Sequence, residues 1–273
     1  MTKLPILMTA SVSTHGMVGA DFSDEQREKM YVESLLFYCN ELLRRDNARK
    51  VVFVENSDWD LVRIKDAIPD EFKGQIEYVS LNYEEFDVSK GKGYNELLLI
   101  NKAIEKSNFI NQARAFMKVT GRYPIYNLGY YIKDAEHFFQ KKGGVFYGDI
   151  KDHKVYDFLF PNNTLKWNGH AAYTVLFATT VDFYEKNLGK LYNECNDYTG
   201  RWVECVWYDY LKQYRGKSNS GVQLRFKREP ICGGLQGSSA QTIAFSKSNQ
   251  SLKSKIMRLV GNVFRILTPW FWF

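Results

Sequence analysis

Short apolar runs alternate with segments of helical periodicity over the first 120 residues. Four apolar runs are typical of buried strands, and they cover residues 4–12, 50–56, 76–81 and 115–119. Three segments between them repeat apolar residues at helical spacing, over residues 24–43, 58–68 and 94–107. Ser23 and Gln26 form a capping-box pattern at the start of the first helix. This alternation predicts an α/β fold, with a mostly parallel central sheet flanked by helices.

The second half of the chain is less regular. Residues 145–163 are rich in β-forming side chains, and residues 173–195 predict a strand that turns into a helix. Residues 201–214 predict a helix rich in aromatic side chains, and residues 230–242 form a Gly/Ser loop. No clean linker precedes residue 246, so we predict one domain over residues 1–245.

The last 28 residues, 246–273, have a different pattern. On a helical wheel seven apolar residues share one face: Leu252, Ile256, Leu259, Val260, Val263, Ile266 and Leu267. Lys255, Arg258 and Arg265 lie opposite, and two tryptophans, Trp270 and Trp272, follow Pro269. A basic amphipathic helix that ends in aromatic residues is typical of an interfacial membrane anchor. We therefore predict membrane contact for the three basic residues and both tryptophans. The alternative is a helix docked on the domain, with the aromatic rings in a groove.

Charge and cysteine content narrow the class of protein. The net charge of +6 is spread along the chain, so it predicts no nucleic-acid partner and suits a phosphate-bearing ligand or an anionic membrane. The four cysteines have no metal-ligand spacing, which indicates a reducing compartment. The N-terminal apolar run is too short for a signal peptide or a span. These features together predict a cytoplasmic protein.

Small and polar residues follow three of the predicted strands. They are Thr9, Ala10 and Ser11 after the first strand, Asn56 and Ser57 after the second, and Thr120, Gly121 and Arg122 after the last. Ligands of parallel α/β sheets bind at the carboxyl ends of the strands. We therefore expect these residues to converge, with Arg122 holding an anion. The alternative is a plain strand end, since turns use the same residue types.

Residues 89–96, SKGKGYNE, resemble a phosphate-binding loop. Gly91 and Gly93 allow close approach of the backbone, Lys90 and Lys92 supply charge, and a helix begins just after them. The loop has no GxxxxGK[ST] motif. A solvated Lys/Gly turn is the alternative.

Candidate metal ligands are few. Asp58 and Asp60 have DxD spacing, but they lie at the start of a predicted helix, where Asp is common. No DxD follows the strand at residues 115–119. We therefore expect no metal site, with Arg122 offsetting phosphate charge in place of a divalent ion.

Glu204 is the candidate general base. It lies between Val203 and Cys205, close in sequence to Trp202 and Trp207. Such surroundings shift the pKa of a carboxylate and suit proton transfer. An exposed helical Glu is the alternative, and two aspartates, Asp149 and Asp157, are weaker candidates.

Seven segments, taken in order, resemble bacterial glycosyltransferases of capsule, O-antigen and other surface-polysaccharide clusters, GT-A-like in fold and lacking the usual DxD. They are LPILMTASV, VVFVENSDWDL, KGKGYNELLLINKAIEKS, FMKVTGRYPIYN, TVLFATTVDFYEKNL, RWVECVWYDYL and CGGLQGSSAQ, and they span residues 4 to 242. The resemblance implies a nucleotide-sugar donor and a lipid-linked or oligosaccharide acceptor at the inner face of the cell membrane.

The resemblance also implies roles for single residues. The three strand ends and residues 90–93 would line the donor site, and Glu204 would be the base of an inverting enzyme. Gly237 and Ser238 would lie in an acceptor-side loop, although this chain continues Ser-Ser-Ala where the family has Ser-Thr-Gly. Two other functions are compatible with the sequence: another nucleotide-dependent transferase, and a non-enzymatic membrane-associated scaffold.

Overall fold

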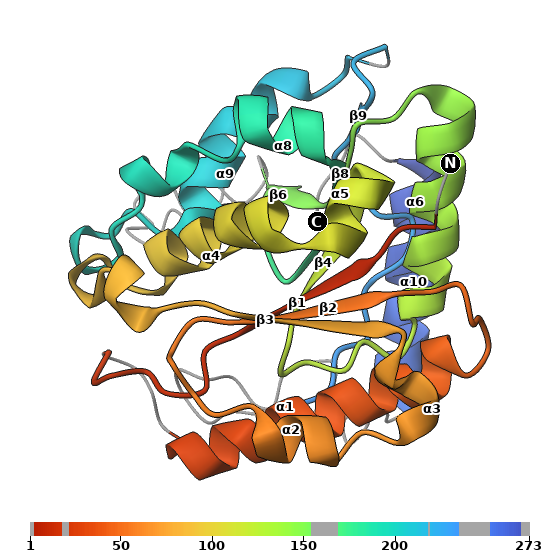
Figure 1. The fold of residues 1–273 in the computed structure, drawn as a ribbon. Coiled ribbons are helices and arrows are strands. Elements are labelled where there is room, and N and C mark those ends of the chain that lie inside the picture. The colour runs from red at the N-terminus through yellow and green to blue at the C-terminus, as the bar shows by residue number, and fades with distance from the viewer. Residues whose placement is uncertain (1–2, 18–21, 154–168, 218, 235–251, 269–273) are drawn as a thin grey trace.

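The computed structural model describes residues 3–17, 22–153, 169–217, 219–234 and 252–268. The main sheet has seven strands in the order β3-β2-β1-β4-β8-β5-β9 (Figure 1). Its strands are β1 (Ile6–Ala10), β2 (Val51–Glu55), β3 (Ile76–Ser80), β4 (Ala115–Thr120), β5 (Phe146–Tyr147), β8 (Leu176–Thr180) and β9 (Val222–Gln223). A separate antiparallel pair joins β6 (Ile150–Asp152) to β7 (His170–Ala172). The predicted α/β fold is confirmed.

The first half of the sheet is parallel. β1 pairs with β2 on one side and with β4 on the other, and β2 pairs with β3, all in parallel register. β8 then joins β4 in antiparallel register. The carboxyl ends of β1, β2 and β4 therefore lie next to one another at one edge of the sheet.

Helices cover both faces of the sheet (Figure 1). They are α1 (Asp24–Tyr38), α2 (Val62–Asp66), α3 (Asp70–Lys73), α4 (Lys92–Lys106), α5 (Asn108–Ala113), α6 (Leu128–Lys142), α8 (Val181–Asn187), α9 (Val203–Leu211) and α10 (Leu252–Leu267). Alternate residues of β1 enter two different cores: Ile6 and Met8 pack with α1 and α6, and Leu7 packs with α4 and α9. Burial on both faces explains why the parallel strands are apolar almost throughout.

Several boundaries differ from the predicted ones for local reasons. The predicted capping box of Ser23 and Gln26 is present at the start of α1, and after Tyr38 the chain continues as a π-helical turn to Leu43. α2 begins only at Val62, because Asp58 has a positive φ of 56°. α6 was not predicted from the pattern.

The polar face of α10 contacts the domain, and its apolar face points outward. Asn262 Oδ1 accepts the backbone N–H of Glu229, and the guanidinium of Arg265 lies 2.7 Å from a carboxylate oxygen of Asp149. Arg265 also donates to the carbonyl of Phe226. Leu259 and Leu267 are both 65% exposed. The helix is therefore docked, as the alternative prediction has it, but through its polar residues.

The orientation of α10 changes the expectation for its basic residues. Arg265, predicted to contact a membrane, faces the domain and is only 13% exposed in its side chain. Lys255 is exposed and Arg258 is partly buried. Trp270 and Trp272 lie outside the described residues. No helix in the described part of the chain combines the length and apolar character that crossing a membrane requires.

Candidate functional site

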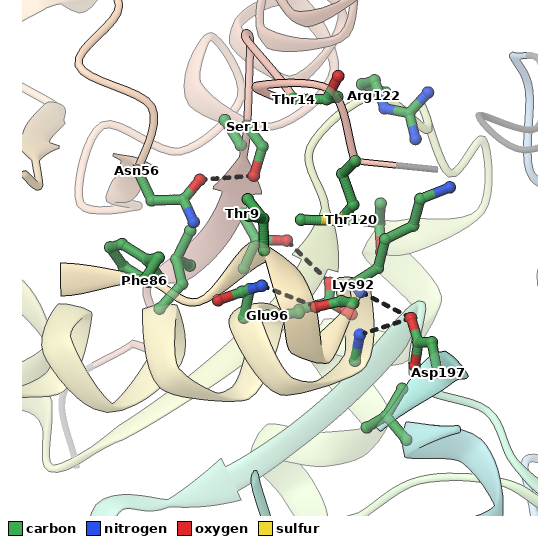
Figure 2. A pocket seen from close by; sticks show the side chains of 18 of the residues that line it. Thr9, Ser11, Thr14, Asn56, Phe86, Lys92, Glu96, Thr120, Arg122 and Asp197 are labelled. Atoms are coloured by element: carbon green, nitrogen blue, oxygen red, sulfur yellow. Dashed lines mark hydrogen bonds between the residues drawn. The ribbon is translucent and has the colours of Figure 1, made fainter. Parts of the chain in front are cut away.

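The three polar strand ends meet in one pocket, as predicted. The pocket has a volume of about 550 Å³, within the range of small-molecule sites. It is lined by ten of the predicted residues: Thr9, Ala10, Ser11, Asn56, Gly91, Lys92, Gly93, Thr120, Arg122 and Glu204. The hydroxyl of Ser11 donates to Asn56 Oδ1 over 2.5 Å and joins the ends of β1 and β2 (Figure 2).

Three predicted residues lie near the pocket without lining it. Ser57 is bonded to the buried carboxylate of Glu55, which also accepts the backbone N–H of Val12 over 3.0 Å. A Cβ on Gly121 would lie 2.6 Å from the carbonyl oxygen of Thr9. Ser57 and Gly121 therefore hold strand ends together. Lys90 is the third predicted residue that does not line the pocket. Gly237 and Ser238 lie outside the described residues.

Arg122 brings a guanidinium with two buried, unpaired nitrogens to the pocket. Its Nε and Nη1 atoms are buried, and neither has a hydrogen-bond partner in the described part of the chain. The guanidinium lies 5.3 Å from the ring centre of Tyr123. Buried guanidinium N–H groups without acceptors are costly unless a ligand supplies the acceptors. The geometry therefore favours an anion site over a plain strand end.

The predicted phosphate loop is organised differently from our expectation. The backbone N–H groups of Lys92 and Gly93, at the start of α4, donate to one carboxylate oxygen of Asp197, over 2.6 Å and 3.2 Å. A Cβ on Gly91 would lie 2.5 Å from the Cβ of Asp197. An internal carboxylate thus occupies the amides that were expected to hold a phosphate. The glycines allow the chain around Asp197 to pack closely against α4.

The pocket floor holds a buried ion pair that the sequence analysis missed. Lys118, in the middle of β4, is completely buried, and its Nζ lies 2.6 Å from Oε1 of Glu96 on α4. It also donates to the Thr120 hydroxyl and the Thr174 carbonyl, each over 2.9 Å. The Thr9 hydroxyl donates to the same carboxylate oxygen (Figure 2). A single polar network therefore joins β1, β4, α4 and the turn between β7 and β8.

Glu204 lies in the first turn of α9 and lines the pocket. Burial raises the pKa of its carboxyl above the ordinary value, and the nearby carboxylates of Glu96 and Asp197 raise it further. Lys118 acts in the opposite direction. The partly buried position is consistent with proton transfer and differs from the alternative of an exposed helical Glu.

Two aromatic rings close the pocket near the end of β2. His15 stacks on Tyr83 with 3.5 Å between ring centres, and the His15 ring nitrogen Nε2 lies 3.0 Å from the Ser57 carbonyl oxygen. Both rings line the pocket. Neither was predicted, because the two residues are 68 positions apart and no local pattern connects them.

Both carboxylates of the candidate DxD pair accept backbone N–H groups. Asp58 accepts the backbone N–H of Tyr83, and Asp60 accepts that of Val62 at the start of α2, each over 3.0 Å. In the part of the chain that the structure describes, no group of three or more His, Cys, Asp or Glu side chains is placed to hold a metal ion. Independence from metal stays a prediction.

Comparison with known proteins gives a distant likeness of fold. No protein-family model matches the chain, and no curated protein matches its sequence. The mannosyltransferase Ktr4p from S. cerevisiae is 10% identical, with a TM-score of 0.48, over 94% of this chain and 81% of that one. The galactosyltransferase LgtC is 9% identical, with a TM-score of 0.48, over 82% and 74%.

A further likeness is to the inositol-1-phosphate CTP transferase from T. maritima. It is 11% identical, with a TM-score of 0.47, over 97% of both chains. At these values the similarities concern the arrangement of helices and strands and leave the reaction open.

Proposed function

We propose that this protein is a glycosyltransferase of bacterial surface-polysaccharide synthesis, which moves a sugar from a nucleotide-sugar donor to a lipid-linked or saccharide acceptor. The observation that carries the proposal is Arg122, whose guanidinium has two buried nitrogens, Nε and Nη1, without a hydrogen-bond partner among the described residues. It lies where three parallel strands end in polar residues. A sugar nucleotide supplies the missing acceptors through its diphosphate, and guanidinium geometry matches phosphate oxygens.

Arg122 would act on the leaving group. As the bond between the anomeric carbon and the diphosphate oxygen breaks, negative charge grows on that oxygen, and a fixed cation stabilises it. Figure 2 shows the charged ends of Arg122 and Lys92 on the same side of the pocket. This arrangement supports a reaction in which side-chain cations replace a divalent metal ion.

Glu204 would act on the acceptor as the general base. Its carboxylate takes the proton of an acceptor hydroxyl, whose oxygen attacks the anomeric carbon opposite the departing diphosphate and inverts its configuration. A carboxyl with a raised pKa is a stronger base than an ordinary one, which favours this role.

A thermal-shift panel of UDP-, GDP-, TDP- and CMP-linked sugars, with and without EDTA, tests the proposal. We expect one donor to stabilise the protein, equally well in EDTA. Arg122→Ala should weaken donor binding about 10- to 100-fold, because hydrogen bonds to a charged group contribute about 1.5–3 kcal/mol. Arg45→Ala is the control, since Arg45 is 70% exposed in its side chain. Unchanged donor affinity in Arg122→Ala would refute the role of Arg122, and a shift lost in EDTA would refute metal independence.

We also propose that α10 binds the inner face of the cytoplasmic membrane. Its exposed apolar residues include Leu252, Leu259 and Leu267, each at least 65% exposed, and Lys255 on the same helix is exposed as well. A helix that exposes both an apolar surface and a cation suits an anionic bilayer. The helix would lie flat, held to the domain by its polar face.

Co-sedimentation with phosphatidylglycerol-containing vesicles tests the membrane proposal. Leu259→Asp should abolish binding, and Val62→Asp, which changes an exposed apolar residue on α2, should leave it unchanged. The alternative outcome is a wild-type protein that does not bind vesicles and forms a dimer, which Leu259→Asp disrupts. This result would show that a second copy of the chain covers α10 instead.

A further inference from the structure

Two exposed aromatic rings stand at the mouth of the pocket. Outside α10, the large apolar side chains that are exposed in the described part of the chain are Val62, Tyr198 and Trp202. Tyr198 is 52% exposed and Trp202 is 39% exposed, and both line the pocket. Rings left in water at the edge of a polar pocket mark a surface that meets a ligand.

The loop that carries these rings is held in place from both sides. Asn196 and Arg201 exchange backbone hydrogen bonds of 2.9 Å in both directions, which closes the loop at its base. The Asp197 carboxylate fastens the loop to the first amides of α4. The Tyr198 hydroxyl donates to the carbonyl of Val88 over 3.4 Å. The Asp197 carboxylate, which occupies the amides expected to bind a phosphate, therefore positions the two rings.

The loop leads directly into the helix of the candidate base. Trp202 is the N-cap residue of α9, and Glu204 follows in the first turn. A molecule that rests on the rings is therefore presented to the Glu204 carboxylate. In the proposed reaction this is the side on which the acceptor hydroxyl must lie, opposite the diphosphate near Arg122.

We propose that Tyr198 and Trp202 form an acceptor platform, on which a saccharide ring of the acceptor stacks beside Glu204. The proposal rests on the proposed function and names the chemical class of the acceptor at this site. A sugar ring has an apolar face of C–H bonds, which packs on the electron-rich face of an aromatic ring. Its hydroxyl groups need polar neighbours, which Glu96, Asp197 and Glu204 supply.

A lipid chain fits this surface less well than a sugar. The two rings are bordered by charged groups, because the carboxylates of Glu96, Asp197 and Glu204 line the same pocket. An acyl chain on the rings would desolvate these charges without giving them hydrogen bonds. Any lipid portion of the acceptor would then lie outside the platform.

Saturation-transfer-difference NMR on the full chain tests the platform. The probes are the methyl glycosides of glucose, galactose, mannose and N-acetylglucosamine, each measured with a nucleoside diphosphate present. We expect one glycoside to receive saturation mainly on the protons of one ring face. Trp202→Ala should reduce this signal at least fivefold, Trp202→Phe should keep about half of it, and Val62→Ala should leave it unchanged.

Kinetic measurements separate a platform for the acceptor from a role in donor binding. Trp202→Ala should raise the KM for the acceptor at least tenfold and leave the KM for the donor unchanged, with an unaltered melting temperature as the folding control. A reversed pattern, or a glycoside signal that survives in Trp202→Ala, overturns the platform. Wild-type protein that binds no glycoside but is stabilised by a nucleotide sugar overturns the platform and leaves the transferase proposal standing. If no nucleotide sugar stabilises the protein, the transferase proposal is refuted. A glycoside signal that depends on Trp202 would then still support a sugar site.

Discussion

Replacing Lys118 tests whether the buried ion pair holds the pocket floor together. The side chain is 0% exposed, and its Nζ lies 2.6 Å from the Glu96 carboxylate. Lys118→Met keeps most of the side-chain volume but removes the charge and three hydrogen bonds. We expect a large loss of stability, because the Thr174 carbonyl also loses its donor.

The loss of stability depends on which of the two side chains, Lys118 or Glu96, is replaced. Loss of one partner of a buried ion pair costs about 3–5 kcal/mol. The Glu96 side chain is 26% exposed, so water solvates part of its charge, and Lys118→Met should cost about 3 kcal/mol. Glu96→Leu leaves a fully buried ammonium group without its carboxylate, and it should cost about 4–5 kcal/mol.

Urea unfolding of the wild type, the two single variants and the double variant measures the interaction between the two side chains. The double variant contains no unpaired buried charge. Its loss of unfolding free energy should therefore be smaller than the sum of the single losses by at least about 2 kcal/mol. Arg44 and Glu71 form the matched control, because both side chains are about 60% exposed (60% and 58%), and their coupling should stay below about 1 kcal/mol.

Additivity would refute the reasoning. If the two single losses sum to the loss of the double variant within about 0.5 kcal/mol, the ion pair contributes no coupling and the network around Lys118 is a set of independent contacts. Larger destabilisation by Lys118→Met than by Glu96→Leu would also contradict it, because the fully buried partner should be the more costly one to leave unpaired.

Three further predictions concern Glu204, Gly91 and Arg265. Glu204→Gln should lower the turnover rate about 10²- to 10⁴-fold. Because burial raises the pKa of the Glu204 carboxyl, its charged form destabilises the fold above that pKa. Glu204→Gln should therefore be more stable than the wild type at neutral pH, and the difference should shrink as pH falls through the raised pKa. A wild type that is at least as stable as the variant at pH 8 would contradict this. Gly91→Ala should lower the free energy of unfolding in urea by about 2–3 kcal/mol, because φ is 86° and the new Cβ meets Asp197. A loss below about 0.5 kcal/mol would show that the loop adapts to the new side chain. Arg265→Met should cost about 3 kcal/mol by removing the ion-pair partner of the buried Asp149 carboxylate. Lys255→Met should change stability by less than about 0.5 kcal/mol. Equal effects of the two variants would show that α10 is not docked through Arg265.

The strands and the pocket edge were predictable because both follow from local patterns. Apolar runs bounded by polar residues mark buried parallel strands. Once β1, β2 and β4 are parallel neighbours, their carboxyl ends must meet. The residues that follow them, Ser11, Asn56 and Arg122, then line one pocket without further information.

The surroundings of α4 were not predictable in this way. The pattern KGKG correctly indicates a close backbone approach at a helix start. The group that approaches is the carboxylate of Asp197, about a hundred residues further along the chain. Glycine spacing reports the closeness of a contact and not the identity of the partner, so an internal anion and a phosphate give the same local pattern.

Lys118 did leave a signal in the sequence. It interrupts an apolar strand, and in a strand its side chain shares a face with residues 116 and 120. A charged residue on the buried face of a central strand requires a partner. The partner, Glu96, lies on α4, and its position next to Lys118 is visible only when the chain is folded.

The orientation of α10 shows what a helical wheel leaves open. The wheel separates an apolar face from a basic one but does not tell which face meets the protein. Here the domain offers acceptors, the Asp149 carboxylate and the Phe226 carbonyl, and both bind Arg265. Burial of these charges requires their pairing, so the polar face is committed to the domain. The apolar face is thereby turned outward, and a bilayer surface or a second chain is needed to cover it.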